Sequence, residues 1–160
     1  IVDTASAQGL QRYEVSAFAR SGHRCAHNLN YWTFGDYLGL GAGAHGKLSF
    51  PDRVIRQVRW RDPATSLGRA MQGQSVSNTH ALGAADLPFE FMLNALRLAH
   101  GFDLALLPQR TGMGLQVVDA AVEKAVARGW LVREGTRLAP TPKGFDFLSD
   151  VQQLFLPDAG

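Results

Sequence analysis

The fold of this chain is decided by the stretch that reads GWLVREGTRLAPTP over residues 129–142. Trp130-Leu131-Val132 and Arg137-Leu138-Ala139 are short runs that can pair across a turn at Glu134-Gly135. The glycine at the start of the stretch is typical of a helix end, and the Thr-Pro pair near its end is typical of a helix start. The stretch therefore predicts a β-hairpin between two helices.

Apolar residues at helical spacing predict three helices in all, two upstream and one downstream of this hairpin. Asp86 can cap the first, with Pro88 in its first turn and Gly101 just past its end. The second runs from about Gly114 to Arg128. The expected inward positions are Phe89, Met92, Leu93, Leu96 and Ala99 in the first helix, Leu115, Val118, Val122, Ala125 and Val126 in the second, and Phe145, Leu148, Val151 and Phe155 in the last. Helix, helix, hairpin, helix predicts a winged-helix-like domain over residues 86–156.

The first part of the chain has patterns that are typical of β-strands. Loose alternation predicts strands over residues 11–18 and from Val54 to Trp60. Residues 36–44 are apolar and glycine-rich, which favours a buried strand of the parallel kind that is covered on both faces. Residues 68–85 are small and polar, so we expect a linker or exposed loop there.

The run from His27 to Gly46 has the composition of a ligand site. Its glycines let a backbone approach a ligand closely, and its imidazoles supply a metal ligand or a proton carrier. His23, Cys25 and His27 alternate, a spacing that suits zinc, copper or haem iron if the segment is extended. Taken alone, each residue is better explained as a hydrogen-bonded or solvent-facing histidine or as a small apolar cysteine.

Two other features of this run also leave alternatives open. Tyr31 and Trp32 can flank a flat ligand or anchor a core. The glycines of residues 39–46 resemble a dinucleotide fingerprint only loosely, because the third spacing is wrong and no βαβ unit follows.

Composition narrows the classes of function. The 160 residues carry a net charge of +2, and the helix that would enter a DNA groove exposes as many acids as bases, so nucleic-acid binding is not favoured. The single cysteine excludes a disulfide framework or an iron–sulfur cluster held by this chain alone, and it fits a reducing cytoplasm. No apolar run is long enough for membrane insertion. The chain starts at Ile1, so we expect it to be a piece of a longer protein.

Several motifs carry a resemblance to a known family. They are Tyr13-Glu14-Val15-Ser16, Gly22-His23, the run His27-Asn28-Leu29-Asn30-Tyr31-Trp32, the run from Gly35 to Gly46, Leu87-Pro88-Phe89-Glu90-Phe91-Met92, Arg110-Thr111-Gly112, Gly129-Trp130-Leu131 and the run from Leu138 to Gly144. With these motifs the sequence resembles the C-terminal half of the HemW-like radical SAM proteins over nearly its whole length. The His-Asn-x-x-Tyr-Trp motif is the specific part, since it separates these proteins from true coproporphyrinogen dehydrogenases.

The resemblance implies a fold class and a domain organisation. The parent would have an α/β architecture, with this chain an α+β piece of it. Residues 1–67 would be the last strands of a partial (β/α) barrel, residues 68–85 a linker, and residues 86–156 the winged-helix-like domain. The full-length parent would carry S-adenosylmethionine and a [4Fe-4S] cluster, whose cysteine motif is absent here. This chain alone would therefore not be an enzyme.

The resemblance also implies site residues. His27 becomes the candidate haem ligand, and it is the only metal-binding residue expected. Gly41, Gly43, Ala44 and His45 match a loop near S-adenosylmethionine in the dehydrogenases. His45 replaces an aliphatic residue there, which favours a haem chaperone over a decarboxylase. The full set of expected cofactor-binding residues is His27, Asn28, Tyr31, Trp32, Gly41, Gly43, Ala44 and His45.

The sequence thus predicts part of a cytoplasmic protein that binds haem and delivers it to haem-dependent proteins. One alternative is an oxygen-independent coproporphyrinogen III oxidase, which decarboxylates propionate side chains by radical chemistry. Another is a winged-helix interaction or DNA-binding module. Because strand 36–44 would lack neighbours, we also expect an exposed apolar edge or self-association through its sheet.

Overall fold

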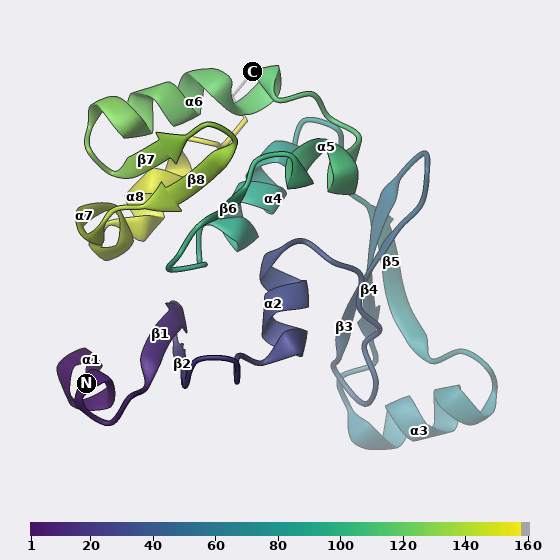
Figure 1. Cartoon of the computed structure of the whole chain (residues 1–160). Coiled ribbons are helices and arrows are strands. Elements are labelled where there is room, and N and C mark those ends of the chain that lie inside the picture. Colours follow the sequence, from purple (N-terminus) through teal and green to yellow (C-terminus); the bar gives the residue numbers. More distant parts are fainter. Residues whose placement is uncertain (158–160) are drawn as a thin grey trace. The chain divides into compact units, whose positions relative to one another are not determined.

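The computed structural model describes residues 1–157 and divides into two compact units (Figure 1). The first unit combines Ile1–Phe34 with the residues from Ala85 onward, and the second is Gly35–Ala84. The second unit ends within one residue of the expected start of the C-terminal domain at residue 86, whereas the expected boundary at residue 67 falls inside this unit. The N-terminal segment packs with the C-terminal domain, a long-range association that local sequence patterns do not reveal.

The C-terminal part of the first unit has the element order of a winged-helix domain. The strands pair antiparallel in the order β6-β8-β7, and Val132 lies opposite Ala139 in the hairpin. The predicted order of helix, helix, hairpin and helix is confirmed. The elements are α4 (Leu87–Ala95), β6 (Phe102–Asp103), α5 (Leu106–Thr111), α6 (Gln116–Ala127), β7 (Leu131–Glu134), β8 (Arg137–Pro140), α7 (Pro142–Asp146) and α8 (Leu148–Gln153).

Three details of this domain differ from the sequence prediction. The two short elements α5 and β6 had not been expected, because six and two residues give too little periodicity. The expected last helix is two helices, α7 and α8, separated at Phe147. In α6 the expected inward residue Val126 is 38% exposed, whereas Val118, Val122 and Ala125 are buried as predicted.

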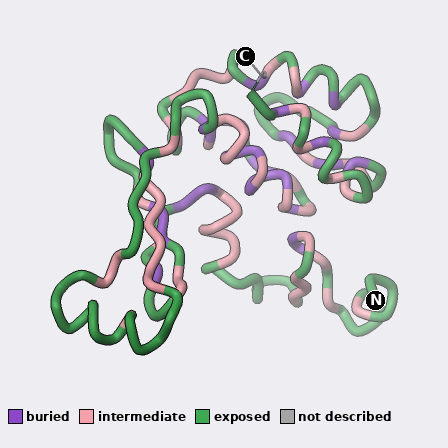
Figure 2. The backbone as a smooth tube through the Cα atoms, turned by 180° about the vertical axis from the view of Figure 1, so that it is seen from behind, coloured by how far each residue is buried: buried purple, intermediate pink, exposed green. Residues whose placement is uncertain are grey.

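Aromatic contacts form the centre of the first unit's core. Phe91 packs edge-on against Phe34 at 5.8 Å and against Phe102 at 5.7 Å between ring centroids. Phe91 and Met92 are fully buried, while Phe89 of the predicted stripe is half-buried. The purple segments of α4, α6 and β8 in Figure 2 follow this core.

The N-terminal segment of the first unit contains α1 (Val2–Ala7), a hairpin of β1 (Gln11–Glu14) and β2 (Ala17–Ala19), and α2 (Ala26–Trp32). The single strand expected over residues 11–18 is therefore wrong. The backbone N–H of Ser16 donates to the Glu14 carboxylate at 3.0 Å, which stabilises a turn in the middle of that segment. Tyr13 joins β1 to the C-terminal part, since its carbonyl accepts a hydrogen bond from Ala99 at 3.0 Å.

The second unit is a three-stranded antiparallel sheet with one helix. Its elements are β3 (His45–Ser49), β4 (Val54–Arg59), α3 (Pro63–Met71) and β5 (Val76–Ala81), and the sheet order is β3-β4-β5. The predicted strand at Val54–Trp60 is confirmed as β4. The loop expected over residues 68–85 is wrong, because that segment holds the end of α3 and all of β5.

The buried parallel strand expected over residues 36–44 is also wrong. In the described residues all paired strands are antiparallel, and residues 36–44 contribute a single bridge between Tyr37 and Lys47. Leu38 and Leu40 are 66% and 83% exposed. Positive φ angles at Gly41 (92°) and Gly43 (70°) interrupt extended backbone here. The mixed helix and strand content confirms the α+β class.

No helix among residues 1–157 is long and apolar enough to cross a membrane.

Candidate functional site

The His-Asn-x-x-Tyr-Trp motif forms most of helix α2. The helix starts after Cys25, whose backbone is extended and whose side chain makes no capping hydrogen bond. Residues four apart lie on the same side of a helix, so His27 and Tyr31 share one side and Asn28 and Trp32 share another. The extended arrangement that would align His23, Cys25 and His27 is not formed.

Asn28 and Trp32 attach α2 to the rest of the first unit. The Asn28 Nδ2 donates to the Tyr13 Oη at 3.0 Å, and Tyr13 is 4% exposed. The Arg97 guanidinium lies over the Trp32 ring, 4.2 Å from its centroid. One ring face of Trp32 is therefore occupied by a side chain of this unit, which indicates an anchor.

A buried carboxylate holds Arg97 against Trp32. Glu14 is 1% exposed, and its Oε2 accepts from Arg97 Nη2 at 3.3 Å. Its Oε1 accepts from the backbone N–H and the hydroxyl of Ser16, at 3.0 and 2.9 Å. Neither Glu14 nor Arg97 is among the site residues expected from the sequence. Arg97 is 83 residues from its partner, so no local pattern identifies the pair.

His27 and Tyr31 lie on a neighbouring face of α2. His27 is exposed and Tyr31 is half-exposed, with its ring edge-on to Trp32 at 4.7 Å. A neutral imidazole nitrogen on an exposed helix position can coordinate a haem iron from outside. In the part of the chain that is described, no group of three or more His, Cys, Asp or Glu side chains could hold a bare metal ion.

The glycine run of residues 39–46 forms a tight loop in the second unit. A Cβ at Gly39 would overlap the backbone carbonyl of His45, so only glycine fits there. Gly43 donates its N–H to the Trp60 carbonyl at 2.8 Å, and the Ala44 carbonyl accepts from Arg59 at the same distance. Gly43 and Ala44 are therefore tied to β4, while His45 begins β3 and is exposed.

A hollow of about 590 Å³ lies between this loop and α3. Arg59 crosses it: its Nε donates to the Gly39 carbonyl at 3.0 Å, and its Nη1 donates to the Ser75 hydroxyl. Gly41 lines this hollow. Gly43, Ala44 and His45 do not. The lining residues are Gly39, Leu40, Gly41, Ala42, Arg59, Pro63, Ser66, Leu67, Ala70 and Ser75. Its volume is in the range of small-molecule sites.

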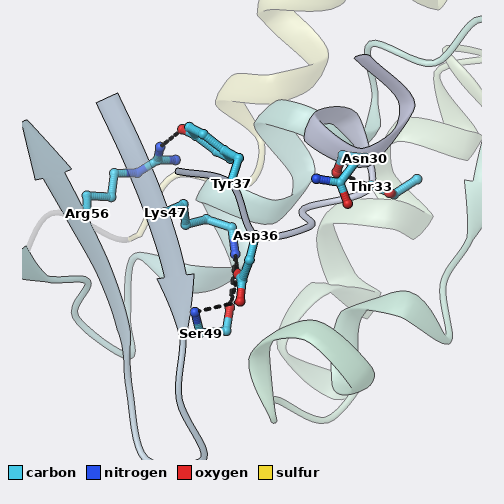
Figure 3. A network of polar contacts seen from close by, with 7 residues as sticks. All are labelled: Asn30, Thr33, Asp36, Tyr37, Lys47, Ser49 and Arg56. Atoms are coloured by element: carbon cyan, nitrogen blue, oxygen red, sulfur yellow. Dashed lines mark hydrogen bonds and ion pairs between the residues drawn. The ribbon is translucent and has the colours of Figure 1, made fainter. Parts of the chain in front are cut away.

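A polar network holds the entry to the glycine loop (Figure 3). The Lys47 Nζ, with a side chain 2% exposed, donates to the Asp36 Oδ1 at 2.9 Å and to the Ser49 hydroxyl at 3.0 Å. Partial burial pushes the pKa of Asp36 up, but hydrogen bonds from Lys47 and Ser49 outweigh it, so the pKa lies below its ordinary value. Tyr37 accepts from Arg56 at 3.2 Å alongside.

The expected site therefore divides between the two compact units. His27, Asn28, Tyr31 and Trp32 lie in the first, and Gly41, Gly43, Ala44 and His45 lie in the second. Within each unit the members of one group lie close together along the chain. The iron–sulfur cluster of the expected parent does not fit this chain, because the sequence has one cysteine and such clusters need several.

Comparison with known proteins decides the relationship. Residues 82–147 match the HemN C-terminal domain. The chain is 39% identical over 154 residues to the heme chaperone HemW of Escherichia coli, covering 96% of this chain and 40% of that protein. Over nearly its whole length, this chain is similar to the C-terminal part of HemW. A second HemW, from Haemophilus influenzae, is 35% identical over 151 residues, covering 94% of the chain and 38% of that protein.

A solved structure supports the fold assignment. It is the Escherichia coli coproporphyrinogen III oxidase (HemN), described as a radical SAM enzyme, with a TM-score of 0.65 and 16% sequence identity. The match covers 96% of this chain and 38% of that one. At this identity the likeness shows the fold alone. The chain spans about 40% of the length of the curated HemW proteins described above.

Proposed function

We propose that this chain is part of a protein that binds haem and delivers it to haem-dependent proteins, with His27 as the axial ligand. The observation that carries the proposal is an exposed imidazole on a helix that is anchored through the neighbouring face by Asn28 and Trp32. The relatives named heme chaperone supply the ligand class. Haem-receiving proteins are the implied partners, and the single cysteine fits a cytoplasmic location.

The exposed position of His27 suits a carrier that must release its cargo. A haem enclosed on both faces is held by many apolar contacts, whereas one axial bond from a surface histidine leaves the other face open to an acceptor. Tyr31, one turn further along α2, can cover part of the ring. Asn28 and Trp32 then serve as anchors of the helix.

We propose that the loop containing Gly41, Gly43, Ala44 and His45 lies beside S-adenosylmethionine in the longer protein. The close approach at Gly39 and the adjoining hollow support a loop whose backbone meets a ligand. S-adenosylmethionine would supply radical chemistry only with a cluster, and this chain contributes no ligands for one. A coproporphyrinogen oxidase activity therefore remains an alternative for the parent, which turnover of coproporphyrinogen by the cluster-loaded parent would reveal.

The winged-helix domain gives little support for DNA binding. Arg133, one of the two basic residues of the hairpin, pairs with Asp119 of α6 at 3.4 Å.

Self-association through the second unit stays a prediction. Light scattering at high concentration tests it, and a strictly monomeric particle would contradict it.

The test is a haem titration followed at the Soret band. We expect His27→Ala to weaken binding at least about tenfold and to change the Soret position, because the axial ligand is lost. The matched control is His23→Ala, which removes another exposed histidine from the same segment. Binding by the His27→Ala variant that equals wild type in spectrum and affinity would remove His27 from the site.

A further inference from the structure

Arg97 connects the winged-helix domain to the helix that carries the candidate haem ligand. It follows α4 directly, and its guanidinium lies between the Glu14 carboxylate and the Trp32 ring. We propose that Arg97 is a positioning residue, which fixes the rotation of α2 and thereby presents His27 to haem. This inference rests on the proposed function, which supplies the ligand.

Helix α2 depends on outside contacts for its order. It has seven residues, and helices of this length are marginal in water. Its N-cap, Cys25, makes no side-chain capping bond. The tertiary contacts of Asn28 and Trp32, one helical turn apart, contribute to both the position and the rotation of the helix.

The chemistry of this cluster suits orientation better than stability. The Nε of Arg97 and the Nε1 of Trp32 are both buried without a hydrogen-bond partner, which is costly. An apolar side chain could fill the place of Arg97 without the first of these unpaired donors. Only a planar guanidinium, however, can pair with a carboxylate and stack on an indole together, and this sets the ring plane of Trp32.

The tests use the 160-residue chain with Arg97→Met and Arg97→Lys, and Arg128→Met as the matched control. Arg128 makes a comparable contact elsewhere, 4.8 Å from the Trp130 ring centroid. Hydrogen exchange of the haem-free chain measures the order of α2. We expect Arg97→Met to raise exchange in Ala26–Trp32 without changing α6, and Arg128→Met to leave α2 unchanged.

Haem titration then tests the consequence for binding. We expect Arg97→Met to weaken haem binding about tenfold while the Soret position of the bound form stays that of wild type, since His27 remains the ligand. Arg97→Lys keeps a charge for Glu14 but lacks the planar stack. It should melt at the wild-type temperature yet bind haem more weakly than wild type, a separation that a purely structural role would not produce.

The outcomes separate this inference from the proposed function. Wild-type affinity in Arg97→Met or in Arg97→Lys would overturn the positioning role. If the wild-type chain binds no haem, the proposed function fails, and hydrogen exchange alone decides whether Arg97 orders α2. Unchanged exchange in Arg97→Met would then overturn the inference as well.

Discussion

The two compact units keep their structure by different means. The first has a core of aromatic and aliphatic side chains around Phe91, whereas among the buried apolar residues of the described chain only Val54 belongs to the second. The second unit depends on strand pairing and on the polar network around Lys47. Regions with few buried apolar contacts open more easily than packed cores. The candidate haem ligand thus lies in the unit that we expect to resist local unfolding, and the glycine loop lies in the unit that opens more easily.

The largest expected effect comes from the core of the first unit. Phe91→Ala removes the ring that contacts both Phe34 and Phe102, and we expect a loss of about 3–5 kcal/mol in the free energy of unfolding. Val54→Ala in the second unit should lower the free energy of unfolding by only about 1.6 kcal/mol, because this change removes two methyl-sized groups from a small core. Urea unfolding measures both. Equal losses would remove the distinction between the units.

Glycine substitutions probe the loop of the second unit. Gly39→Ala places a Cβ on the His45 carbonyl and should unfold the loop, whereas Gly41→Ala meets open space and only the strain of its φ of 92°. We expect about 1–2 kcal/mol for the second change and more for the first. Hydrogen exchange of residues 35–84 follows the unfolding of this unit. A larger effect at Gly41 would contradict the close packing at Gly39.

Low pH should loosen the second unit. The pKa of Asp36 in the folded chain lies below its ordinary value of 3.8, so the stabilisation from Asp36 is complete above that value. It is lost as the pH falls from there through the lower folded pKa. Hydrogen-exchange protection of residues 35–84 between pH 5 and about 3, corrected for the intrinsic exchange rate at each pH, checks this.

Asp36→Asn should remove that part of the pH dependence. The control is Asp52→Asn, which removes an exposed carboxylate paired with Arg53. A pH dependence that persists in Asp36→Asn would show that other groups produce it.

The smallest effects come from matched helix caps. Thr141 caps α7 by accepting from the Gly144 N–H at 3.0 Å, and Asp62 caps α3 by accepting from the Thr65 N–H at 2.7 Å. Thr141→Ala should lower the free energy of unfolding by about 1 kcal/mol. Asp62→Ala should raise hydrogen exchange in α3 alone. If Asp62→Ala changed the unfolding of the first unit, the two units would not unfold independently, contrary to this expectation.

The sequence was most informative where apolar periodicity was long. Val118, Val122 and Ala125 repeat over a twelve-residue helix, and the hairpin has a turn signal between its strands, so both were predicted correctly. Residues 36–44 were misassigned because an apolar run reads as a strand, although Gly41 and Gly43 bend the backbone. Strand β5 was missed because residues 68–85 are mostly polar, and this exposed strand has few apolar residues that could alternate.

The candidate site shows the same limit. The motif from His27 to Trp32 was found by resemblance, and its helical form then assigned roles by spacing. Its supports, Tyr13, Glu14 and Arg97, act through contacts between segments far apart in the chain. No pattern within a single segment contains that information, so only a structure identifies them.

The most direct test of the account is resonance Raman spectroscopy of the ferrous haem complex. With ¹⁵N-labelled histidine we expect an iron–histidine stretching band that shifts with the label, is lost in His27→Ala and persists in His23→Ala. An unchanged band in His27→Ala would contradict the assignment of His27 as the ligand.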